Sequence, residues 1–255
     1  MQVPERILYL TASFDPELPR ECKSAPYPHE TKFLCYTEEA RTGWHSGWRF
    51  CHFSASEKQQ LKEHVWSKGS TRPNVLKARF VKTQFCRLAE VVAYAPTVVC
   101  WIDGNMQIVS DNFCQLFLPL LADNLIVTYP HNFLAHAHDD VRSVRNDTPH
   151  MVKRYATEPV QQQIDVYTAD GYTEEVSNAH GYICTGIVAV RPYYNTPQAA
   201  SVTQMMDAWW QEILTWSIHD QVGLAYSLWK RDVKHGMICD GKITGSDGHW
   251  YWHHV

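Results

Sequence analysis

The hydrophobic and polar positions follow two kinds of pattern along the chain. Short apolar runs rich in β-branched residues predict strands, because such side chains fit a pleated and largely buried surface. Strands are expected at residues 7–11, 32–37, 97–102, 125–129 and 183–190. Segments with apolar residues three or four positions apart predict helices between them. This alternation of strands and helices predicts an α/β chain.

The predicted helices have recognisable starting signals. Ser56 and Gln59 form a candidate capping box for a helix that reaches about Lys68, and Asn74 is a candidate cap for the next helix. Further helices are expected over about 112–121, over 160–169 and, as a pair, between residues 197 and 230.

The strand at 97–102 is the most informative of these elements. It is apolar enough to be buried on both faces, and it ends at Asp103, Gly104 and Asn105. Ligands of open α/β sheets bind beyond the carboxyl ends of strands. The oxygens of Asp103 and Asn105 suit Mg²⁺ or Mn²⁺ held together with a diphosphate. An ordinary turn is the alternative, because Asp, Gly and Asn also favour turns.

Composition narrows the classes of function. The chain has 255 residues with 23 Lys and Arg against 27 Asp and Glu, a net charge of −4, which argues against nucleic acid as a partner. With 45% hydrophobic residues and no repeat or linker, one domain over residues 1–255 is expected. The 10 Trp, 13 Tyr, 9 Phe and 14 His are numerous for this length, and they fit a core, a sugar-stacking surface or a metal site.

The apolar stretches and the cysteines indicate where in the cell the protein is expected. The longest apolar stretches are interrupted by Pro96, Pro119 and Asp123, so no transmembrane segment is expected, and the first residues lack a secretory signal. The eight cysteines stand singly, without a Cys-x-x-Cys pair, and are interpreted as mostly buried, reduced thiols. A cytoplasmic protein, either free or peripheral to a membrane, is therefore expected.

Several motifs occur in a fixed order between Pro73 and Leu228. They are Arg79, Lys82, Arg87 to Glu90, Trp101 to Asn105, Tyr129 to His131, Gln163 and Ile164, Tyr167, Gly171, Gly186 to Arg191, and His219 to Gln221. In this order they resemble the GT-A-like glycosyltransferase family best known from plant mucilage proteins and formerly catalogued as a domain of unknown function. Residues before Pro73, apart from the first strand, and those between His131 and Gln163 carry no landmark of that family.

The resemblance implies a fold and a reaction. The fold would be a single GT-A-like α/β domain with a mainly parallel, twisted sheet flanked by helices. Residues 1 to about 130 would hold the nucleotide and residues from about 131 to 255 the acceptor. The activity would be hexosyl or pentosyl transfer from a nucleotide-diphosphate-sugar donor to a glycan or other hydroxyl acceptor. Mn²⁺ or Mg²⁺ would neutralise the departing diphosphate.

The resemblance also gives roles to residues of the donor side. Asp103 would begin the Asp-X-Asp-type motif, with Asn105 in place of its last Asp; this substitution removes a negative charge and puts strict metal dependence in doubt. Arg79 and Lys82 share one helix face and would contact the diphosphate, with a solvated helix face as the alternative. Trp101 would lie near the donor. Gly186 would let the sugar approach the backbone, or would only mark a strand bulge.

The remaining candidates lie in the second half. Asp220 is either a helix N-cap or, as the resemblance implies, the general base of an inverting reaction. If the enzyme retains configuration, Asp220 or Gln221 would position or stabilise the sugar. His249 or His253 would supply the last metal ligand, and plain surface rings are the alternative.

Two other classes of function compete with the transferase. A metal-activated water beside His residues would suit a ceramidase-like amide hydrolase, because the resembling family carries that label in places. A non-catalytic carbohydrate-binding protein would use the aromatic rings to stack on sugars. The buried strand that ends in Asp-Gly-Asn disfavours the latter, because sugar-binding modules are usually all-β.

Overall fold

The computed structural model describes residues 4–14, 18–22, 29–68, 72–109, 113–131, 133–145, 149–192, 197–239, 242–246 and 249–253. Its larger sheet contains β1 (Arg6–Ser13), β2 (Glu30–Thr37), β3 (Trp44–His45), β4 (Trp48–Cys51), β5 (Val98–Ile102), β7 (Ile126–Pro130), β8 (Ile183–Val190) and β9 (His235–Met237). Its smaller sheet contains β6 (Met106–Ile108), β10 (Lys242–Ser246) and β11 (His249–His253).

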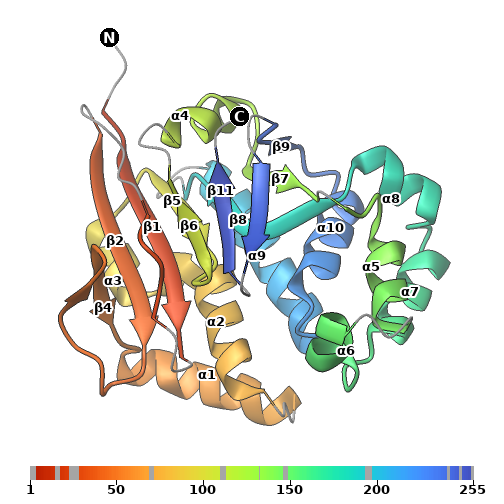
Figure 1. Ribbon diagram of the computed structural model, residues 1–255, viewed down its shortest axis with the longest axis horizontal. Coiled ribbons are helices and arrows are strands. Elements are labelled where there is room, and N and C mark those ends of the chain that lie inside the picture. Colours follow the sequence, from red (N-terminus) through yellow and green to blue (C-terminus); the bar gives the residue numbers. More distant parts are fainter. Residues whose placement is uncertain are drawn as a thin grey trace.

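The larger sheet is mainly parallel, and it has the order β3-β4-β2-β1-β5-β8-β7-β9 (Figure 1). The pairs β4–β2, β2–β1, β1–β5 and β7–β9 are parallel, whereas β8 runs antiparallel to both β5 and β7, and β3 runs antiparallel to β4. The chain first adds β2 and β4 on one side of β1 and then crosses to β5 on its other side. In open α/β sheets, such a reversal marks the crevice where ligands bind.

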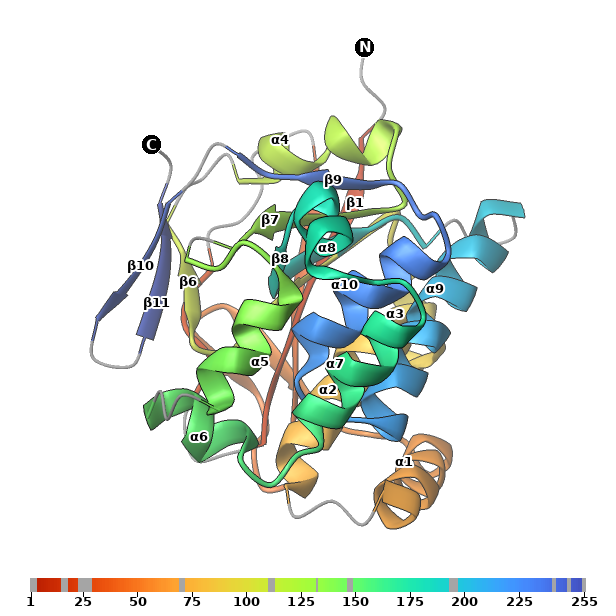
Figure 2. The ribbon, with the colours of Figure 1, turned by 90° about the vertical axis from the view of Figure 1, so that its right-hand side faces the viewer.

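The helices are α1 (Ala55–Lys68), α2 (Pro73–Gln84), α3 (Ala89–Tyr94), α4 (Cys114–Phe117), α5 (Ala137–Arg145), α6 (Pro149–Tyr155), α7 (Val160–Ala169), α8 (Glu174–His180), α9 (Pro197–Thr215) and α10 (Asp220–Lys230). Helices α2, α9 and α10 pack together against β1 and β8 on one face of the sheet. Helix α4 lies toward the opposite face, and α5 to α8 gather around α10 beside the sheet (Figures 1 and 2). The α/β class, with a mainly parallel sheet flanked by helices, is confirmed.

The alternating side chains of the strands divide the core into two layers. On β1, Leu8 and Leu10 belong to the layer under α2 and α9, whereas Ile7 and Tyr9 belong to the layer on the opposite face. All five residues of β5 are buried, as the apolar run at 97–102 predicts for a central strand covered on both faces. This burial fixes the strand that carries Asp103 at its end.

The capping box of α1 lies two residues earlier than predicted. The backbone N–H of Glu57 donates to Ser54 Oγ (3.3 Å), and the backbone N–H of Ser54 donates to Glu57 Oε2 (2.6 Å). The Ser56 and Gln59 assignment is therefore wrong, and Gln59 instead donates to Glu63 Oε1 at 2.8 Å. The helix starts earlier because the preceding Phe53 is buried in the core, which fixes where the chain turns.

Two other helix predictions need correction. Asn74 does not cap α2, because the helix begins at Pro73 with Arg72 in the cap position; Asn74 Nδ2 instead donates to the carbonyl of Phe14 (3.1 Å). The helix expected over 112–121 is the short α4 followed by a 3₁₀ turn, because the chain between them passes Pro119, which lacks an N–H. Residue 112 lies outside the described residues.

The predictions on thiols and membrane spans can also be compared with the structure. All eight cysteines are unpaired, and most of them are buried, as predicted; Cys239 is exposed. Burial raises the pKa of the Cys35 thiol to about 12, so this side chain packs as a small apolar group. Within the described residues, no helix is both long enough and apolar enough to cross a membrane. The cytoplasmic location stays a prediction.

Candidate active site

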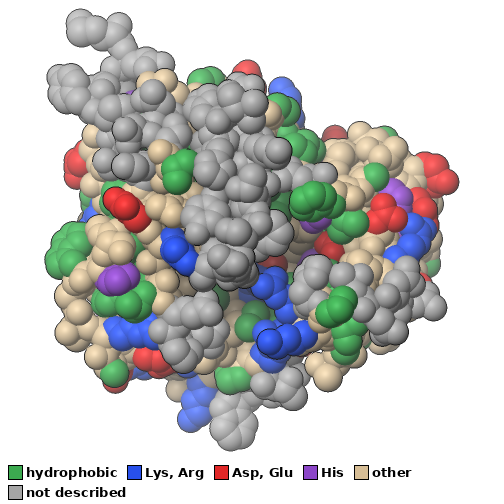
Figure 3. All heavy atoms as spheres, in the orientation of Figure 1, with side chains coloured by type: hydrophobic (Ala, Val, Ile, Leu, Met, Phe, Trp, Pro, Cys, Tyr) green, Lys and Arg blue, Asp and Glu red, His purple; other side chains and the backbone are tan. Residues whose placement is uncertain are grey.

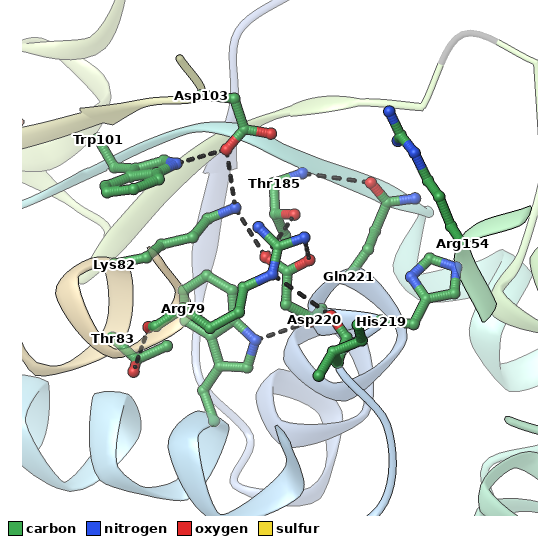
Figure 4. A network of polar contacts seen from close by, with 12 residues as sticks. Arg79, Lys82, Thr83, Trp101, Asp103, Arg154, Thr185, His219, Asp220 and Gln221 are labelled. Carbon is green, nitrogen blue, oxygen red and sulfur yellow. Dashed lines mark hydrogen bonds and ion pairs between the residues drawn. The ribbon is translucent and has the colours of Figure 1, made fainter. Parts of the chain in front are cut away.

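The centre of the site is a buried carboxylate between two cations (Figure 4). Asp220 is the first residue of α10, and Lys82 and Arg79 come from α2. Lys82 Nζ donates to Asp220 Oδ2 (2.7 Å), and Arg79 Nη2 lies 2.9 Å from Asp220 Oδ1. The Lys82 side chain is 0% exposed and that of Asp220 is 3% exposed. The solvated-face alternative for Arg79 and Lys82 is therefore wrong, and His219, not Asp220, holds the cap position of α10.

The charges of this cluster depend on one another. Burial alone would raise the pKa of Asp220, but Arg79 and Lys82 lower it, and the pKa lies below its ordinary value. Burial would lower the pKa of Arg79, yet Asp220 and Asp103 hold it above its ordinary value. Thr185 Oγ1 from β8 donates a further bond to Asp220 Oδ2 (3.1 Å). Removing one member of such a set would leave an uncompensated buried charge.

Asp103 lies beside this cluster, directly after β5. Its Oδ1 accepts a hydrogen bond from Trp101 Nε1 (2.6 Å) and another from Lys82 Nζ (3.4 Å). The Asp103 side chain keeps 32% of its surface exposed. The segment is also a turn, as the alternative predicted, because the backbone N–H of Met106 donates to the Asp103 carbonyl (2.8 Å). The two interpretations are therefore compatible, because the turn holds the Asp103 carboxylate at the end of the sheet with part of its surface exposed.

Aromatic rings enclose the Lys82 ammonium. Its Nζ lies 5.5 Å from the centre of the Trp101 ring and 5.6 Å from that of Trp209 on α9. Trp209 Nε1 in turn donates to the backbone carbonyl of Asp220 (2.7 Å). The rings shield Lys82 from water while their faces attract its charge. Trp101 was predicted for this site, whereas Trp209 belongs to none of the motifs.

A second buried carboxylate, Asp140 on α5, was missed in the sequence. Its Oδ2 accepts hydrogen bonds from Gln221 Nε2 (2.9 Å) and from the Tyr182 hydroxyl. His219 Nε2 lies 3.1 Å from the same oxygen. Burial would raise the pKa of Asp140, but His219 and the hydrogen bonds lower it below its ordinary value. Gln221 Oε1 accepts from the backbone N–H of Thr185 (3.3 Å), so Gln221 links the surroundings of the two buried acids.

A cavity of about 270 Å³ opens in front of these groups, where the sheet order reverses between β1 and β5. One wall contains Trp101, Asp103 and Asn105, which lie at the carboxyl end of β5. The lining also contains three arginines: Arg72, which precedes α2, Arg79 in the middle of α2, and Arg154 near the end of α6. In the orientation of Figure 1, Lys and Arg side chains gather on the face between α2 and α6 (Figure 3). The cavity is thus basic, with one exposed carboxylate.

A larger cavity of about 460 Å³ adjoins the first one at Phe14, the residue that follows β1. Thr37 at the end of β2, Phe53 and Lys77 also line it. The Phe14 and Phe53 rings stack 5.5 Å apart, and Lys77 Nζ lies 5.4 Å from the Phe14 ring centre. The two cavities together follow the carboxyl ends of the neighbouring strands β2, β1 and β5.

Gly186 lies next to the Asp103 turn, and the side chains of neighbouring residues fill the space that a Cβ at this position would need. A Cβ at this position would lie 2.6 Å from Met106 Sδ and 3.0 Å from the Tyr129 hydroxyl. The backbone N–H of Asp103 donates to the Gly186 carbonyl (2.8 Å). Glycine here lets β8 lie close to the Asp103 turn, and its contact with a sugar stays a prediction.

The described residues do not make a good Mn²⁺ or Mg²⁺ site. These ions prefer several oxygen ligands, and among the described residues no group of three or more His, Cys, Asp or Glu side chains could hold a metal ion. Asp103 Oδ1 is already held by Trp101 and Lys82, and the Lys82 ammonium repels a second cation. Asn105 adds only a neutral oxygen. Its part in a metal site stays a prediction, on which no step below depends.

For His249 and His253, the two metal ligands predicted in the tail, the structure describes only the position of the backbone. Strand β11 carries His249 and His253 and pairs in parallel with β6, with Trp250 opposite Met106. The tail segment therefore runs beside the turn that follows Asp103. The side chains of His249 and His253 lie outside the described residues, so that metal binding by either one stays a prediction.

Comparison with known proteins gives similarity in structure alone. No protein-family model matches the sequence, and no curated protein matches it. The chain is similar to mouse xyloside xylosyltransferase 1 in its apo form, with a TM-score of 0.49 and 10% sequence identity over 92% of this chain and 85% of that one. It is also similar to the apo structure of the WbbM bifunctional glycosyltransferase, with a TM-score of 0.46 and 9% identity over 88% of this chain and 39% of that one.

Proposed function

We propose that this protein is a glycosyltransferase that moves a sugar from a nucleoside-diphosphate-sugar donor to a glycan or another hydroxyl acceptor. The observation that carries the proposal is the partly exposed Asp103 carboxylate beside a basic cavity at the carboxyl end of β5. The position of the cavity at the β1–β5 reversal supports a nucleotide-binding, GT-A-like arrangement.

The charges in the cavity suit the chemistry of this transfer. When the bond between the sugar C1 and the donor phosphate breaks, negative charge develops on the leaving diphosphate, and fixed positive groups stabilise it. Arg79 and Arg154 line the cavity in which that charge would form. Asp103, whose Oδ1 is fixed by Trp101 and Lys82, would accept hydrogen bonds from sugar hydroxyls. The acceptor oxygen then bonds to C1 as the bond between C1 and the phosphate oxygen breaks, and the hydroxyl proton passes to the departing diphosphate.

In this proposal Asp220 and Gln221 are positioning residues. Both oxygens of Asp220 are engaged, one by Arg79 and the other by Lys82 and Thr185. A carboxylate with a lowered pKa and two cationic partners is a weak proton acceptor. Asp220 would orient Arg79 toward the diphosphate, and Gln221 would hold Thr185 and Asp140 in register. The general-base role expected for Asp220 has less support than this positioning role.

The rest of the donor has room beside the diphosphate. The cavity that adjoins at Phe14 would accept the nucleoside. The nucleotide would then lie on the half of the chain before about residue 130. The acceptor would approach from the side of Tyr155, which lines the smaller cavity and stacks on His219 with ring centres 4.2 Å apart. Hexosyl or pentosyl transfer, with the acceptor on residues from about 131 onward, completes the proposal.

The two competing functions have less support. A ceramidase-like amide hydrolase would need a metal-activated water, and the described oxygen donors around Asp103 are a poor fit for that metal. A non-catalytic carbohydrate-binding protein would have no use for a buried cluster of Arg79, Lys82 and Asp220. The α/β architecture also differs from the all-β folds usual for such modules.

The test is turnover of a nucleotide-sugar panel. Purified protein is incubated with UDP-, GDP-, ADP- and CDP-sugars, with and without glycan acceptors, and the released nucleoside diphosphate is measured. Asp103→Asn should lower the rate about 100-fold, since loss of one fixed catalytic contact has effects of that order. Asp123→Asn, at an exposed acid that follows a 3₁₀ turn, is the matched control. Equal rates for the two variants, or no release from any donor, would refute the proposal.

A further inference from the structure

We propose that the donor diphosphate is neutralised by cations of the protein itself, with Arg72, Arg79 and Arg154 as its ligands and Lys82 behind them. On this view nucleotide binding needs no divalent metal. The inference rests on the proposed function, since it concerns the donor of that reaction.

Lys82 already occupies the place of a bridging cation. Its Nζ lies 2.7 Å from Asp220 Oδ2 and 3.4 Å from Asp103 Oδ1, and so a single ammonium joins the two carboxylates (Figure 4). A divalent ion often joins two acidic side chains in the same way. Because the Lys82 side chain has no exposed surface, its ammonium group is shielded from solvent and stays inside the site.

The Arg79 guanidinium is bound by protein groups through two of its nitrogens, and its side chain also lines the cavity. Its Nη2 pairs with Asp220 Oδ1 (2.9 Å) and its Nε donates to the carbonyl of Ile218 (3.3 Å). The side chain is 15% exposed and lines the smaller cavity. A guanidinium has five N–H groups, and two parallel N–H bonds match two phosphate oxygens. Arg79 is therefore oriented before any ligand arrives.

Arg72 and Arg154 join the two helices that border the cavity. Arg72, which precedes α2, donates from Nη1 to the backbone carbonyl of Arg154 in the last turn of α6 (2.6 Å). Both side chains line the same cavity as Arg79. Figure 4 shows Arg154 on the opposite side of the cluster from Trp101. A diphosphate in the cavity would thus meet arginines from two directions.

The charge balance matches the ligand. The four cations Arg72, Arg79, Lys82 and Arg154 face the two carboxylates Asp103 and Asp220, which leaves a surplus of two positive charges. A nucleoside-diphosphate sugar carries about two negative charges on its diphosphate at neutral pH. A bound divalent cation would instead add to the surplus and would be repelled by the nearby guanidinium groups.

The experiment measures nucleotide binding with and without metal. UDP, GDP, ADP, CDP and inorganic pyrophosphate are titrated into the wild-type protein by calorimetry, once in EDTA and once in Mn²⁺. The expected result is at least one ligand whose dissociation constant agrees within about threefold between the two conditions. Raising the salt concentration should weaken that binding, because screening acts on arginine–phosphate attraction.

Two variants identify the ligands. Arg154→Gln should weaken binding in EDTA about tenfold or more, because it removes a charge-assisted bond. Lys153→Gln is the matched control: it removes the same charge from the neighbouring exposed position of α6, which does not line the smaller cavity, and should change binding less than twofold. Circular dichroism of both variants confirms that each is folded.

The outcomes separate this inference from the proposed function. Binding that occurs in Mn²⁺ and disappears in EDTA would overturn the inference while leaving the transferase proposal intact. Equal affinities of the Arg154→Gln and Lys153→Gln proteins in EDTA would also overturn it. If no nucleoside diphosphate and no pyrophosphate bound under either condition, the inference and the proposed function would both fail.

Discussion

Asp220 and Asp140 are both buried carboxylates whose negative charge needs compensation, and different groups compensate the two charges. Each carboxylate is about 2% exposed, and each has a pKa below its ordinary value although burial alone would raise it. Asp220 is compensated by two cationic side chains, those of Lys82 and Arg79. Asp140 is compensated by the Tyr182 hydroxyl, the Gln221 amide and the His219 imidazole.

The difference indicates that the two carboxylates have different roles. A carboxylate paired with fixed cations keeps its charge, and it holds those cations in place for an anionic ligand. A carboxylate held by a hydroxyl, an amide and an imidazole mainly orders the side chains around it. Because Gln221 bonds to Asp140 and to the Thr185 backbone, the ordered region around Asp140 supports the charged region around Asp220.

The largest expected effect comes from Asp220→Asn. The substitution leaves Lys82 and Arg79 buried without their main counter-charge, and it should lower the free energy of unfolding by about 3–5 kcal/mol. Urea unfolding followed by circular dichroism measures the change. Adding Lys82→Met to this variant should restore part of the loss, since it removes one of the two cations that Asp220→Asn leaves without a counter-charge. A loss below about 1 kcal/mol for Asp220→Asn alone would contradict the fixed-cation description.

Asp140→Asn should have a smaller effect, about 2–3 kcal/mol. No permanent cation is left unpaired here, and the cost is that of weakened hydrogen bonds from Tyr182 and Gln221 to a charged acceptor. The same urea assay compares the two variants. If Asp140→Asn cost as much as Asp220→Asn, the distinction between compensation by buried cations and compensation by hydrogen bonds would be wrong. Asp165→Asn, at an exposed acid on α7, should lie near zero.

The pH dependence tests the same comparison. Because the pKa of Asp140 is lowered in the folded state, its stabilising contribution is present above the unfolded pKa of about 3.9 and is lost as the pH falls through the folded value. The stability difference between wild type and Asp140→Asn should therefore be constant from pH 7 to 5 and shrink below about pH 4. A difference that grew on acidification would show the opposite sign of shift.

The smallest expected effect is that of Thr185→Val, about 1.5 kcal/mol. The variant removes the hydroxyl that donates to the charged Asp220 Oδ2 while keeping the shape of the side chain. Thr83→Val is the control: it removes an equally buried hydroxyl that donates to a neutral carbonyl, that of Arg79, within α2 (2.8 Å). Differential scanning calorimetry should place the Thr185 variant below the Thr83 variant in Tm. The reverse order would mean that Asp220 gains little from its third donor.

The elements with strong local patterns could be predicted from the sequence. The apolar runs at 97–102 and 183–190 correspond to β5 and β8, because buried strands need a continuous apolar surface. Helices α5 and α6 and the short strands β9 and β11 were not predicted. Helix α6 and the two strands are short and are stable only against their neighbours, whereas α5 carries an amphipathic period that the predictions overlooked.

The candidate site was predicted in part for the same reason. Arg79, Lys82, Trp101, Asp103 and Asp220 were singled out by their motifs, and the structure brings them together around one ammonium group. Asp140, Arg154 and Thr185 were missed, because each is a common polar residue without a motif. Their importance arises only when α5 packs against α10, α6 packs against α5, and β8 pairs with β5.

The bond between Lys82 and Asp220 joins residues 138 positions apart in the chain, whereas β1 and β2 pair across about 24 positions. Closing so long a loop is slow, so folding is expected to complete the sheet around β1 before the charged cluster assembles. Contacts formed after the transition state control the unfolding rate rather than the folding rate. The cluster that we assign to sugar transfer would then also determine how long each molecule remains folded.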